Sequence, residues 1–218
     1  MNEYGTGVRT ITLEDEEYPH QLASLRLRPR LLLTRGPQIP KAGPLLTITG
    51  GREASYEGRR AAYDIALSCA RSGICPVVSS STGIDRHALY GAWEGRRETL
   101  VIFDAPLPRF GWRIPSAILI TPFADERLDE RFRRISSATL CGLWGEATLI
   151  IEAPGSSASL TVAKAALDGG KEVFVHTVGL GSGRLCDGSR QLAEMGAPLI
   201  SSYEELAARL GWQRERMV

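Results

Sequence analysis

Short apolar runs alternate along this chain with longer stretches whose apolar residues recur at helical spacing. Most of the runs are uninterrupted, as in strands that are buried on both faces of a parallel sheet. Pro76 is an unusual residue for such a strand, because it lacks the N–H group that a ladder uses. The runs that predict strands are 31–34, 45–49, 74–78, 99–103, 117–121, 147–151, 172–176 and 198–200.

The stretches between these runs predict helices, and several have a clear start or end. Ser55 and Ser202 are suitable N-caps, Ser202 forms a capping box with Glu205, and Gly73 suits a C-cap. The alternation predicts an α/β fold: a Rossmann-like, doubly wound, mostly parallel sheet with helices on both faces. The predicted helices cover 55–73, a stretch that starts after residue 83, 126–143, 157–167, 189–195 and 202–210.

The chain divides into one core domain with two flanks. Residues 1–43 are rich in Arg and Pro and lead into the stretch 35–44, which cannot be a helix interior. We therefore expect an N-terminal extension, 1–43, that packs on the core. The predicted core domain covers 44–212, and 213–218 form a tail.

The composition is that of an ordinary globular domain. Of 218 residues, 43% are hydrophobic and 23% are charged, and the net charge is +1, so a DNA site has to be a local patch. The polar N-terminus does not resemble a secretory signal, and no run reaches the roughly 18 apolar residues of a membrane span. The cysteines lack CxxC spacing and the histidines are scattered. We expect a cytoplasmic protein with buried free thiols, no metal, no cofactor and no membrane contact.

Three turns rich in small residues follow predicted strands at the carboxyl edge of the sheet and lead directly into helices. They cover 50–55, 79–83 and 154–159. Free N–H groups and the dipole at a helix start bind anions, and ligands of open α/β sheets lie at this edge. We predict a phosphate site there; the alternative is that the turns are only tight connections. The residues assigned to this site are Gly50, Gly51, Arg52, Ser55, Ser80, Ser81, Gly83, Asp85, Ser157, Ser159 and Lys164.

Three of the assigned residues carry charge. Arg52 could grip a phosphate with its guanidinium fork, or it could be a solvated surface residue. Lys164 is predicted at the edge of the buried face of its helix, with its stem leaning back toward the ligand edge; an ordinary surface lysine is the alternative. Asp85 is either a first-turn carboxylate that complements the dipole or an acceptor for a loop backbone or a sugar hydroxyl. His87 and the four tryptophans are assigned to packing or interfaces.

No catalytic set of residues stands out in the sequence. The GxxxxGK[ST] motif is absent, and the first core strand ends in GGREAS, not in GxGxxG. The glycine-rich segment 179–183 opens no helix at the required spacing. Paired carboxylates or a nucleophile with its base are not apparent either. We therefore expect a binding protein and not an enzyme.

Five motifs, in the same order along nearly the whole chain, resemble those of the DprA/Smf family of DNA-processing proteins. The resemblance implies a single-stranded DNA-binding protein that assists the loading of a RecA-type recombinase in DNA uptake and natural transformation, often as a homodimer. The matching stretches are the YP lead-in at 18–19 with its following leucines, ITGGR at 48–52 with Ser55 and Gly58, GID at 83–85, EA at 152–153 with SLT at 159–161, and KEVF at 171–174 with the later GA at 196–197.

Two motifs of that family are altered here. Its SGLAxG loop corresponds to 79–83, which is one residue shorter, and its RNRxIAGL helix corresponds to 136–143, which lacks the two arginines and the asparagine. Arg133 and Arg134, just upstream, are candidates to replace those arginines. We expect these changes to weaken the basic pocket.

Another class of function stays open at this point. The architecture also resembles nucleotide-binding or nucleotide-hydrolysing Rossmann-like proteins such as the phosphoribohydrolases, whose PGGxGTxxE turn would correspond to 154–161 without its glutamate. A sensor or scaffold that binds a free nucleotide without chemistry is a third hypothesis.

Overall fold

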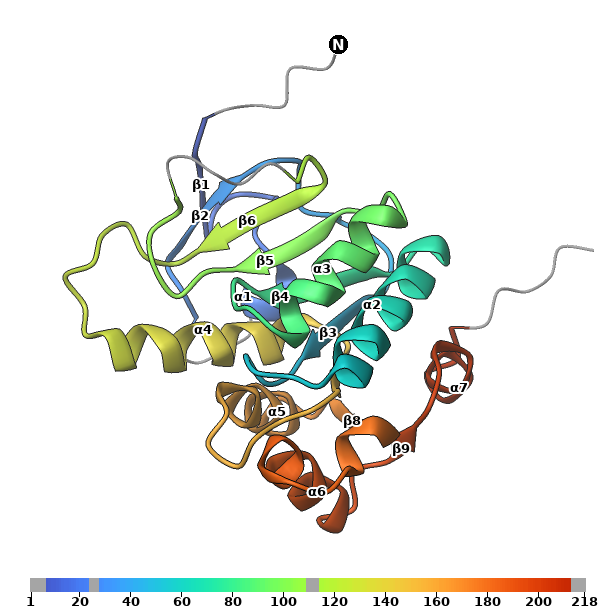
Figure 1. Cartoon of the computed structure of the whole chain (residues 1–218). Helices are drawn as coiled ribbons and strands as arrows, with labels where there is room; N and C mark the ends of the chain where they lie inside the picture. The colour runs from blue at the N-terminus through green and yellow to red at the C-terminus, as the bar shows by residue number, and fades with distance from the viewer. Residues whose placement is uncertain (1–6, 24–27, 109–113, 213–218) are drawn as a thin grey trace, which may run out of the picture.

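The computed structural model describes residues 7–23, 28–108 and 114–212, and their nine strands form one sheet (Figure 1). The strand order is β1-β2-β6-β5-β4-β3-β7-β8-β9. The strands are β1 (Arg9–Thr12), β2 (Leu31–Arg35), β3 (Leu45–Thr49), β4 (Cys75–Ser79), β5 (Thr99–Ile102), β6 (Ala117–Thr121), β7 (Ala147–Ile150), β8 (Glu172–His176) and β9 (Leu199–Ile200).

From β6 to β9 the sheet is parallel, whereas β2 runs antiparallel to β6 and β1 antiparallel to β2. Along the chain, β3, β4, β5 and β6 extend the sheet in one direction, and β7, β8 and β9 then extend it from the other side of β3. The winding direction therefore reverses between β3 and β7, which is the topological switch point of a doubly wound sheet. The predicted Rossmann-like fold is confirmed.

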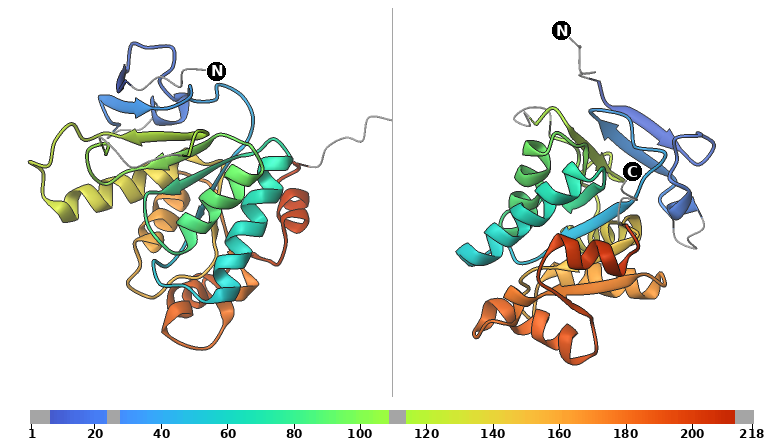
Figure 2. Two further views of the ribbon diagram at one scale, coloured as in Figure 1. Left: turned by 45° about the horizontal axis from the view of Figure 1, so that its top comes forward. Right: turned by 90° about the vertical axis from the view of Figure 1, so that its right-hand side faces the viewer.

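Helices cover both faces of the sheet (Figure 2). The first face carries α2, α3 and α7, whose apolar residues pack on the side chains of Leu46 and Ile48. The second face carries α1, α4, α5 and α6, and Leu45 points to it. The helices are α1 (His20–Ala23), α2 (Tyr56–Arg71), α3 (Ile84–Glu94), α4 (Glu130–Trp144), α5 (Ala158–Asp168), α6 (Asp187–Glu194) and α7 (Tyr203–Arg209), with short 3₁₀ helices η1 (Thr177–Leu180) and η2 (Arg184–Cys186).

Two glycines let neighbouring helices approach closely. A Cβ atom on Gly91 of α3 would lie 2.2 Å from the Tyr63 carbonyl oxygen of α2. On the other face, a Cβ atom on Gly142 of α4 would lie 2.2 Å from the Val162 carbonyl oxygen of α5. Real Cβ atoms do not reach such distances, so the backbones pack at a separation that only glycine permits.

The structure differs from the sequence predictions mainly at element ends. α4 begins at Glu130 and not near 126, because the Asp129 side chain caps it by accepting a hydrogen bond from the Phe132 N–H (3.0 Å). Pro76 is tolerated in β4 because it pairs with β3 alone, opposite Leu46. The pairing of β4 with β5 begins one residue later, at Val77. β1 and α1 were not predicted, since each buries a single side chain and shows no clear period.

The cysteines and tryptophans mostly lie where the sequence placed them. All four cysteines are free and buried. Trp144 is buried and Trp212 is partly buried against the core, whereas Trp93 is half exposed on α3. Trp112 lies outside the described residues. None of the helices in the described ranges has the length and apolar character of a membrane span.

Candidate functional site

The three small-residue turns follow the carboxyl ends of β4, β3 and β7, which are neighbours in the sheet, and so meet at one edge (Figure 1). The Gly51 N–H donates to the Glu152 carbonyl oxygen (2.5 Å), and the Ile84 N–H donates to the Gly51 carbonyl oxygen (3.2 Å). A Cβ atom on Gly83 would lie 2.3 Å from the Arg52 carbonyl oxygen. The predicted convergence is thus confirmed. We call these turns, residues 50–55, 79–83 and 154–159, the rim.

A fourth segment, the glycine-rich stretch 179–183, reaches the same edge. A Cβ atom on Gly179 of η1 would lie 2.2 Å from the Ile151 carbonyl oxygen at the end of β7. The Gly188 N–H at the start of α6 donates to the Ala153 carbonyl oxygen (2.8 Å). Gly179 is needed here because the backbone packs closely against the sheet edge. That 179–183 opens no helix at the spacing of a dinucleotide motif therefore did not indicate where the segment lies. Arg184, the residue after this segment, is exposed.

A buried carboxylate already occupies the start of α2. Glu152 is 3% exposed and accepts hydrogen bonds from the Ser55 N–H (2.8 Å) and the Ser55 hydroxyl (2.6 Å). The Ser55 Oγ in turn accepts from the Gly58 N–H (2.9 Å). The structure thus differs from the prediction in that Ser55 and this helix start are bonded to an internal carboxylate. The N–H groups and helix dipole that would hold a phosphate instead hold an internal carboxylate, which repels a second anion.

A second buried carboxylate lies beneath the first two turns. Asp85 is 1% exposed and accepts hydrogen bonds from the Ser79 N–H (2.8 Å), the Ser79 hydroxyl (2.6 Å), the Thr49 hydroxyl (3.1 Å) and the Gly50 N–H (3.3 Å). Burial raises the pKa of Asp85 to about 6, against the opposing effect of these donors. Asp85 is thus not available for direct contact with DNA. It is an acceptor for the loop backbone that ties the end of β3 to the end of β4.

The serines of the rim mostly bond to their own loops. Ser159 is 2% exposed, and its hydroxyl lies 2.6 Å from the hydroxyl of Ser157, the N-cap of α5. The expectation that Ser159 contacts a ligand is therefore corrected. Ser80 and Ser81 are half-buried; the Ser80 N–H donates to the Ile102 carbonyl oxygen (2.9 Å) and the Ser81 N–H to the Ser79 hydroxyl (3.3 Å). Gly50, Gly51 and Gly83 are buried and bring the turns together.

The two basic residues assigned to the site, Arg52 and Lys164, differ in what their side chains contact. Arg52 is exposed on the first turn, as predicted. Lys164 is also exposed, but its Nζ bonds to the Asp168 carboxylate (2.6 Å), one turn further from the rim. Its predicted lean toward the ligand edge is not observed, because the carboxylate at i+4 attracts the ammonium in the other direction.

Arg133 and Arg134 do not replace the arginines that the resemblance implies. The Arg133 guanidinium donates to three backbone carbonyls, those of Asp104, Glu126 and Leu128, at 2.8–3.0 Å. Arg134 pairs with the carboxylate of Glu130 (2.5 Å). Arg133 thus fastens the start of α4 to the loops around it, whereas Arg134 pairs within the helix and lies 3.9 Å from the Asp104 carboxylate.

Sequence reasoning missed one exposed aromatic at the rim. Tyr56, the first residue of α2, is 71% exposed and lies four residues after Arg52. Aromatic rings next to cationic groups are the usual components of single-strand binding surfaces. The signal was present in the sequence, because a large aromatic directly follows a small-residue turn.

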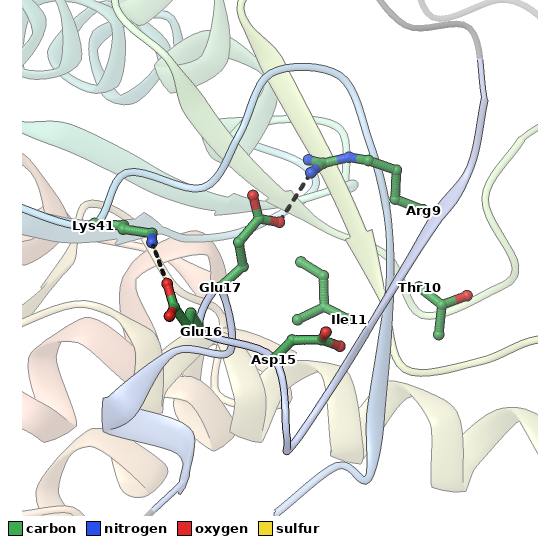
Figure 3. A pocket seen from close by; sticks show the side chains of 7 residues that line it. All are labelled: Arg9, Thr10, Ile11, Asp15, Glu16, Glu17 and Lys41. Carbon is green, nitrogen blue, oxygen red and sulfur yellow. Dashed lines mark hydrogen bonds and ion pairs between the residues drawn. The ribbon is translucent and has the colours of Figure 1, made fainter.

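One hollow lies beside Tyr56, and another lies away from the rim at the edge strand β1. One, of about 440 Å³, runs along α2 between Tyr56 and Ser68 and is closed by His176 and the start of α7. The other, of about 520 Å³, lies at the N-terminal edge strand, and Figure 3 shows its lining. There Arg9 pairs with Glu17 (2.9 Å) and Lys41 with Glu16 (3.6 Å), so the cations are already neutralised.

The order of the strands and the position of the rim at the switch point define a Rossmann-like domain, with Arg52 and the adjacent Tyr56 exposed there. Residues 9–110 match the family model of DNA recombination-mediator protein A. The chain is 25% identical over 219 residues to the DNA processing protein DprA of Bacillus subtilis (strain 168), covering 94% of this chain and 72% of the relative. The chain is thus similar to this DprA/Smf family, over 9–110 by the family model and over most of its length by the relative.

Two solved structures share its fold. DprA from Streptococcus pneumoniae superposes with a TM-score of 0.80 at 20% identity, covering 92% of this chain and 74% of that one. DNA processing protein A from Helicobacter pylori, described for its single-stranded DNA binding mode, gives a TM-score of 0.78 at 18% identity and covers 94% and 97% of the two chains.

Proposed function

We propose that this protein binds single-stranded DNA at the rim and acts as a recombination mediator. Similarity to the DNA recombination-mediator family supports the class of function, and the observation that carries the location is the exposed pair Arg52 and Tyr56 at the switch point. Because Glu152 and Asp85 fill the space behind the turns, the strand lies over them and does not enter the helix starts.

The contacts divide between phosphate and base. Arg52 supplies the charged contact to a phosphate, and Tyr56 supplies a face on which a base stacks. The half-buried Ser80, Ser81 and Ser157 contribute polar groups, while the buried Gly50, Gly51 and Gly83 let the turns that carry these serines pack together. Lys164 contributes only if it leaves Asp168. With so few cations the binding is weak and only modestly dependent on salt.

The remaining expectations belong to the same proposal. The bound strand is passed to a RecA-type recombinase, the protein acts in the cytoplasm, and it works without catalysis of its own. The nucleotide-hydrolase alternative stays a prediction, but the geometry does not favour it, because Glu152, which precedes the 154–161 turn, is buried and bonded to Ser55.

The proposal is tested by fluorescence anisotropy with a labelled single-stranded oligonucleotide across a salt series. Arg52→Ala should weaken binding about tenfold at low salt, since a charged hydrogen bond contributes about 1.5 kcal/mol. It should also reduce the slope of log K against log salt by about 0.7, the value for one phosphate of a single strand.

A matched control lies on the same helix. Arg71 is exposed in the last turn of α2, whose 16 residues span about 24 Å, so Arg71→Ala should leave binding unchanged. Equal affinities and equal salt slopes for the two variants would remove Arg52 from the site. Release of free base from nucleoside monophosphates by the wild-type protein would support the hydrolase instead.

A further inference from the structure

The hollow of about 440 Å³ between α2 and the start of α7 begins directly beside the rim (Figures 1 and 2). We call it the α2/α7 groove. Tyr56, which follows the last rim residue, is part of its lining, and Ala61, Ile65 and Val178 give it apolar contact area. Small-molecule sites have volumes of roughly 300–1,000 Å³, so the groove has room for a nucleobase.

The charges of the groove disfavour the backbone of a DNA strand. Three carboxylates line it, those of Glu57, Asp64 and Glu204, and Arg60 is the only cation among its described lining residues. Like charges repel, so a phosphate is disfavoured here and favoured at the exposed Arg52 on the rim. An uncharged base meets no such repulsion. A strand that contacts Arg52 and Tyr56 therefore lies with its backbone over the rim and its bases toward the groove.

His176 closes the groove without adding a positive charge. Its Nδ1 accepts a hydrogen bond from the Val178 N–H (3.1 Å), and its Nε2 donates to the Ser201 carbonyl oxygen (3.1 Å). A ring that accepts at one nitrogen and donates at the other is neutral. Burial also lowers the pKa of His176 below its ordinary value of 6.5. His176 is thus a wall of the groove and offers nothing to a phosphate.

Glu57 is the carboxylate best placed to contact a base on Tyr56. It is the next residue of α2, both side chains line the groove, and Glu57 is exposed and pairs with no cation in the described part of the chain. Asp64, in contrast, pairs with Arg60 (3.4 Å). An ionised carboxylate only accepts hydrogen bonds, and its two oxygens accept best from two parallel donors.

Guanine is the base that presents such a pair of donors. Its N1–H and its amino group lie side by side on the Watson–Crick edge. Adenine and cytosine each place an acceptor nitrogen beside the amino group, and thymine has carbonyls on both sides of its N3–H. A carboxylate therefore discriminates in favour of guanine.

We propose that Tyr56 and Glu57 form a guanine subsite, in which the base stacks on Tyr56 and donates from N1–H and its amino group to the Glu57 carboxylate. This inference rests on the proposed binding of single-stranded DNA at the rim, and adds to it a base preference and an orientation of the strand. A thymine at the same place stacks on Tyr56 without the two hydrogen bonds.

Fluorescence anisotropy with a short oligo(dT) strand, and with the same strand carrying one central guanine, measures the preference. Wild type should bind the guanine strand about fivefold more tightly, near the lower end for a bidentate base contact because the groove is open to water. Replacement of guanine by hypoxanthine, which lacks the amino group, should remove most of this gain. Replacement by 7-deazaguanine, whose Watson–Crick edge is intact, should preserve it.

Glu57→Gln should bind the two strands equally, because the neutral amide no longer offers two acceptor oxygens. The matched control is Glu172→Gln, which removes an exposed carboxylate at the first residue of β8, at the opposite end of the sheet from the rim. It should keep the fivefold ratio. The ratio of the two affinities is the measured quantity, since any general gain from the loss of a negative charge affects both strands alike.

The outcomes separate this inference from the proposed function. Equal affinities in wild type, or a preference that E57Q retains, would overturn the guanine subsite alone, because binding of the all-thymine strand and its loss in Arg52→Ala test the rim. Binding of neither strand by wild type would overturn both. Binding of an oligoarginine peptide that E57Q abolishes, without any base preference, would assign the groove to a cationic partner instead.

Discussion

At the scale of single residues, two buried carboxylates set the properties of the rim. Burial of an ionised carboxylate is costly unless hydrogen bonds compensate for the lost water. Glu152 is compensated by Ser55 at the start of α2, and Asp85 by Ser79, Thr49 and Gly50. Both hold the turns in place and leave the exposed Arg52 and Tyr56 as the residues available to a ligand.

The pKa of Asp85 predicts a pH dependence of stability. Its folded-state pKa of about 6 lies above the ordinary value of 3.8, so between these values the folded state binds a proton that the unfolded chain does not. The stabilisation is complete below pH 3.8 and is lost as the pH rises through about 6. The size of the loss is about 3 kcal/mol, from a difference of 2.2 pKa units.

Denaturant unfolding of wild type and Asp85→Asn measures this effect. The difference in free energy of unfolding, wild type minus variant, should fall as the pH is raised from about 4 to about 7. Since D85N retains every other titrating group, it serves as the reference for them. Parallel pH profiles of the two proteins would contradict the assignment.

Tyr56 gives a second prediction at this scale. Tyr56→Ala should weaken binding of single-stranded DNA by about 1–3 kcal/mol, the range for loss of one base–aromatic stack, without changing the salt slope. Tyr90→Ala removes a 38% exposed aromatic of α3 and is the control in the same anisotropy titration. If both variants bind as wild type does, no base stacks on Tyr56.

At the scale of elements, backbone contact between helices decides the architecture on each face. α2 meets α3 through Gly91, and α4 meets α5 through Gly142. Neither position had a special signal in the sequence, because a glycine within a helical pattern lowers helix propensity whatever its neighbours are. The need for glycine arises only when the second helix is present.

Gly91→Ala should therefore destabilise the protein by about 1–3 kcal/mol, although alanine favours helix by about 1 kcal/mol. The added Cβ would displace the Tyr63 carbonyl and separate α2 from α3. Gly155→Ala is the matched change, because there the new Cβ meets only the Asp187 Cβ at 3.7 Å. Thermal or denaturant unfolding compares the two, and a similar stability for both would refute the role of the close contact.

At the scale of the whole molecule, all four cysteines are buried, and Cys69, Cys75 and Cys141 belong to the apolar core on the two faces of the sheet. Burial raises the pKa of Cys75 to about 12 and raises those of Cys69 and Cys141 as well, so their thiolates are scarce in the folded state. Cys186 is buried too, but it lies in η2 at the end of a short loop.

Thiol labelling with a chromogenic disulfide at mildly alkaline pH should therefore report unfolding. Cys69, Cys75 and Cys141 should react only at the rate of global unfolding, whereas Cys186 should react first through local opening of η1 and η2. All four should react at once in denaturant, which is the control. Rapid labelling of more than one thiol in native buffer would contradict the burial.

The pattern of neighbouring residues along the chain was enough to identify most strands and helices and the α/β fold class. Uninterrupted apolar runs specify β3, β6 and β8 at their observed bounds, and Ser55, Ser157 and Ser202 specify helix starts, because periodicity and capping act over neighbouring residues. The gathering of the three turns also followed, since the carboxyl ends of parallel strands share one edge.

The use of the rim was settled only by contacts between segments far apart in the chain. Glu152 reaches Ser55 across 97 positions and Asp85 reaches Thr49 across 36, and no local pattern indicates that a carboxylate will fill a helix start. The same holds for Lys164, whose direction depends on Asp168. Spacing along the chain determines which residues can form a strand or a helix, whereas the packing of distant segments determines which of their groups remain free to bind.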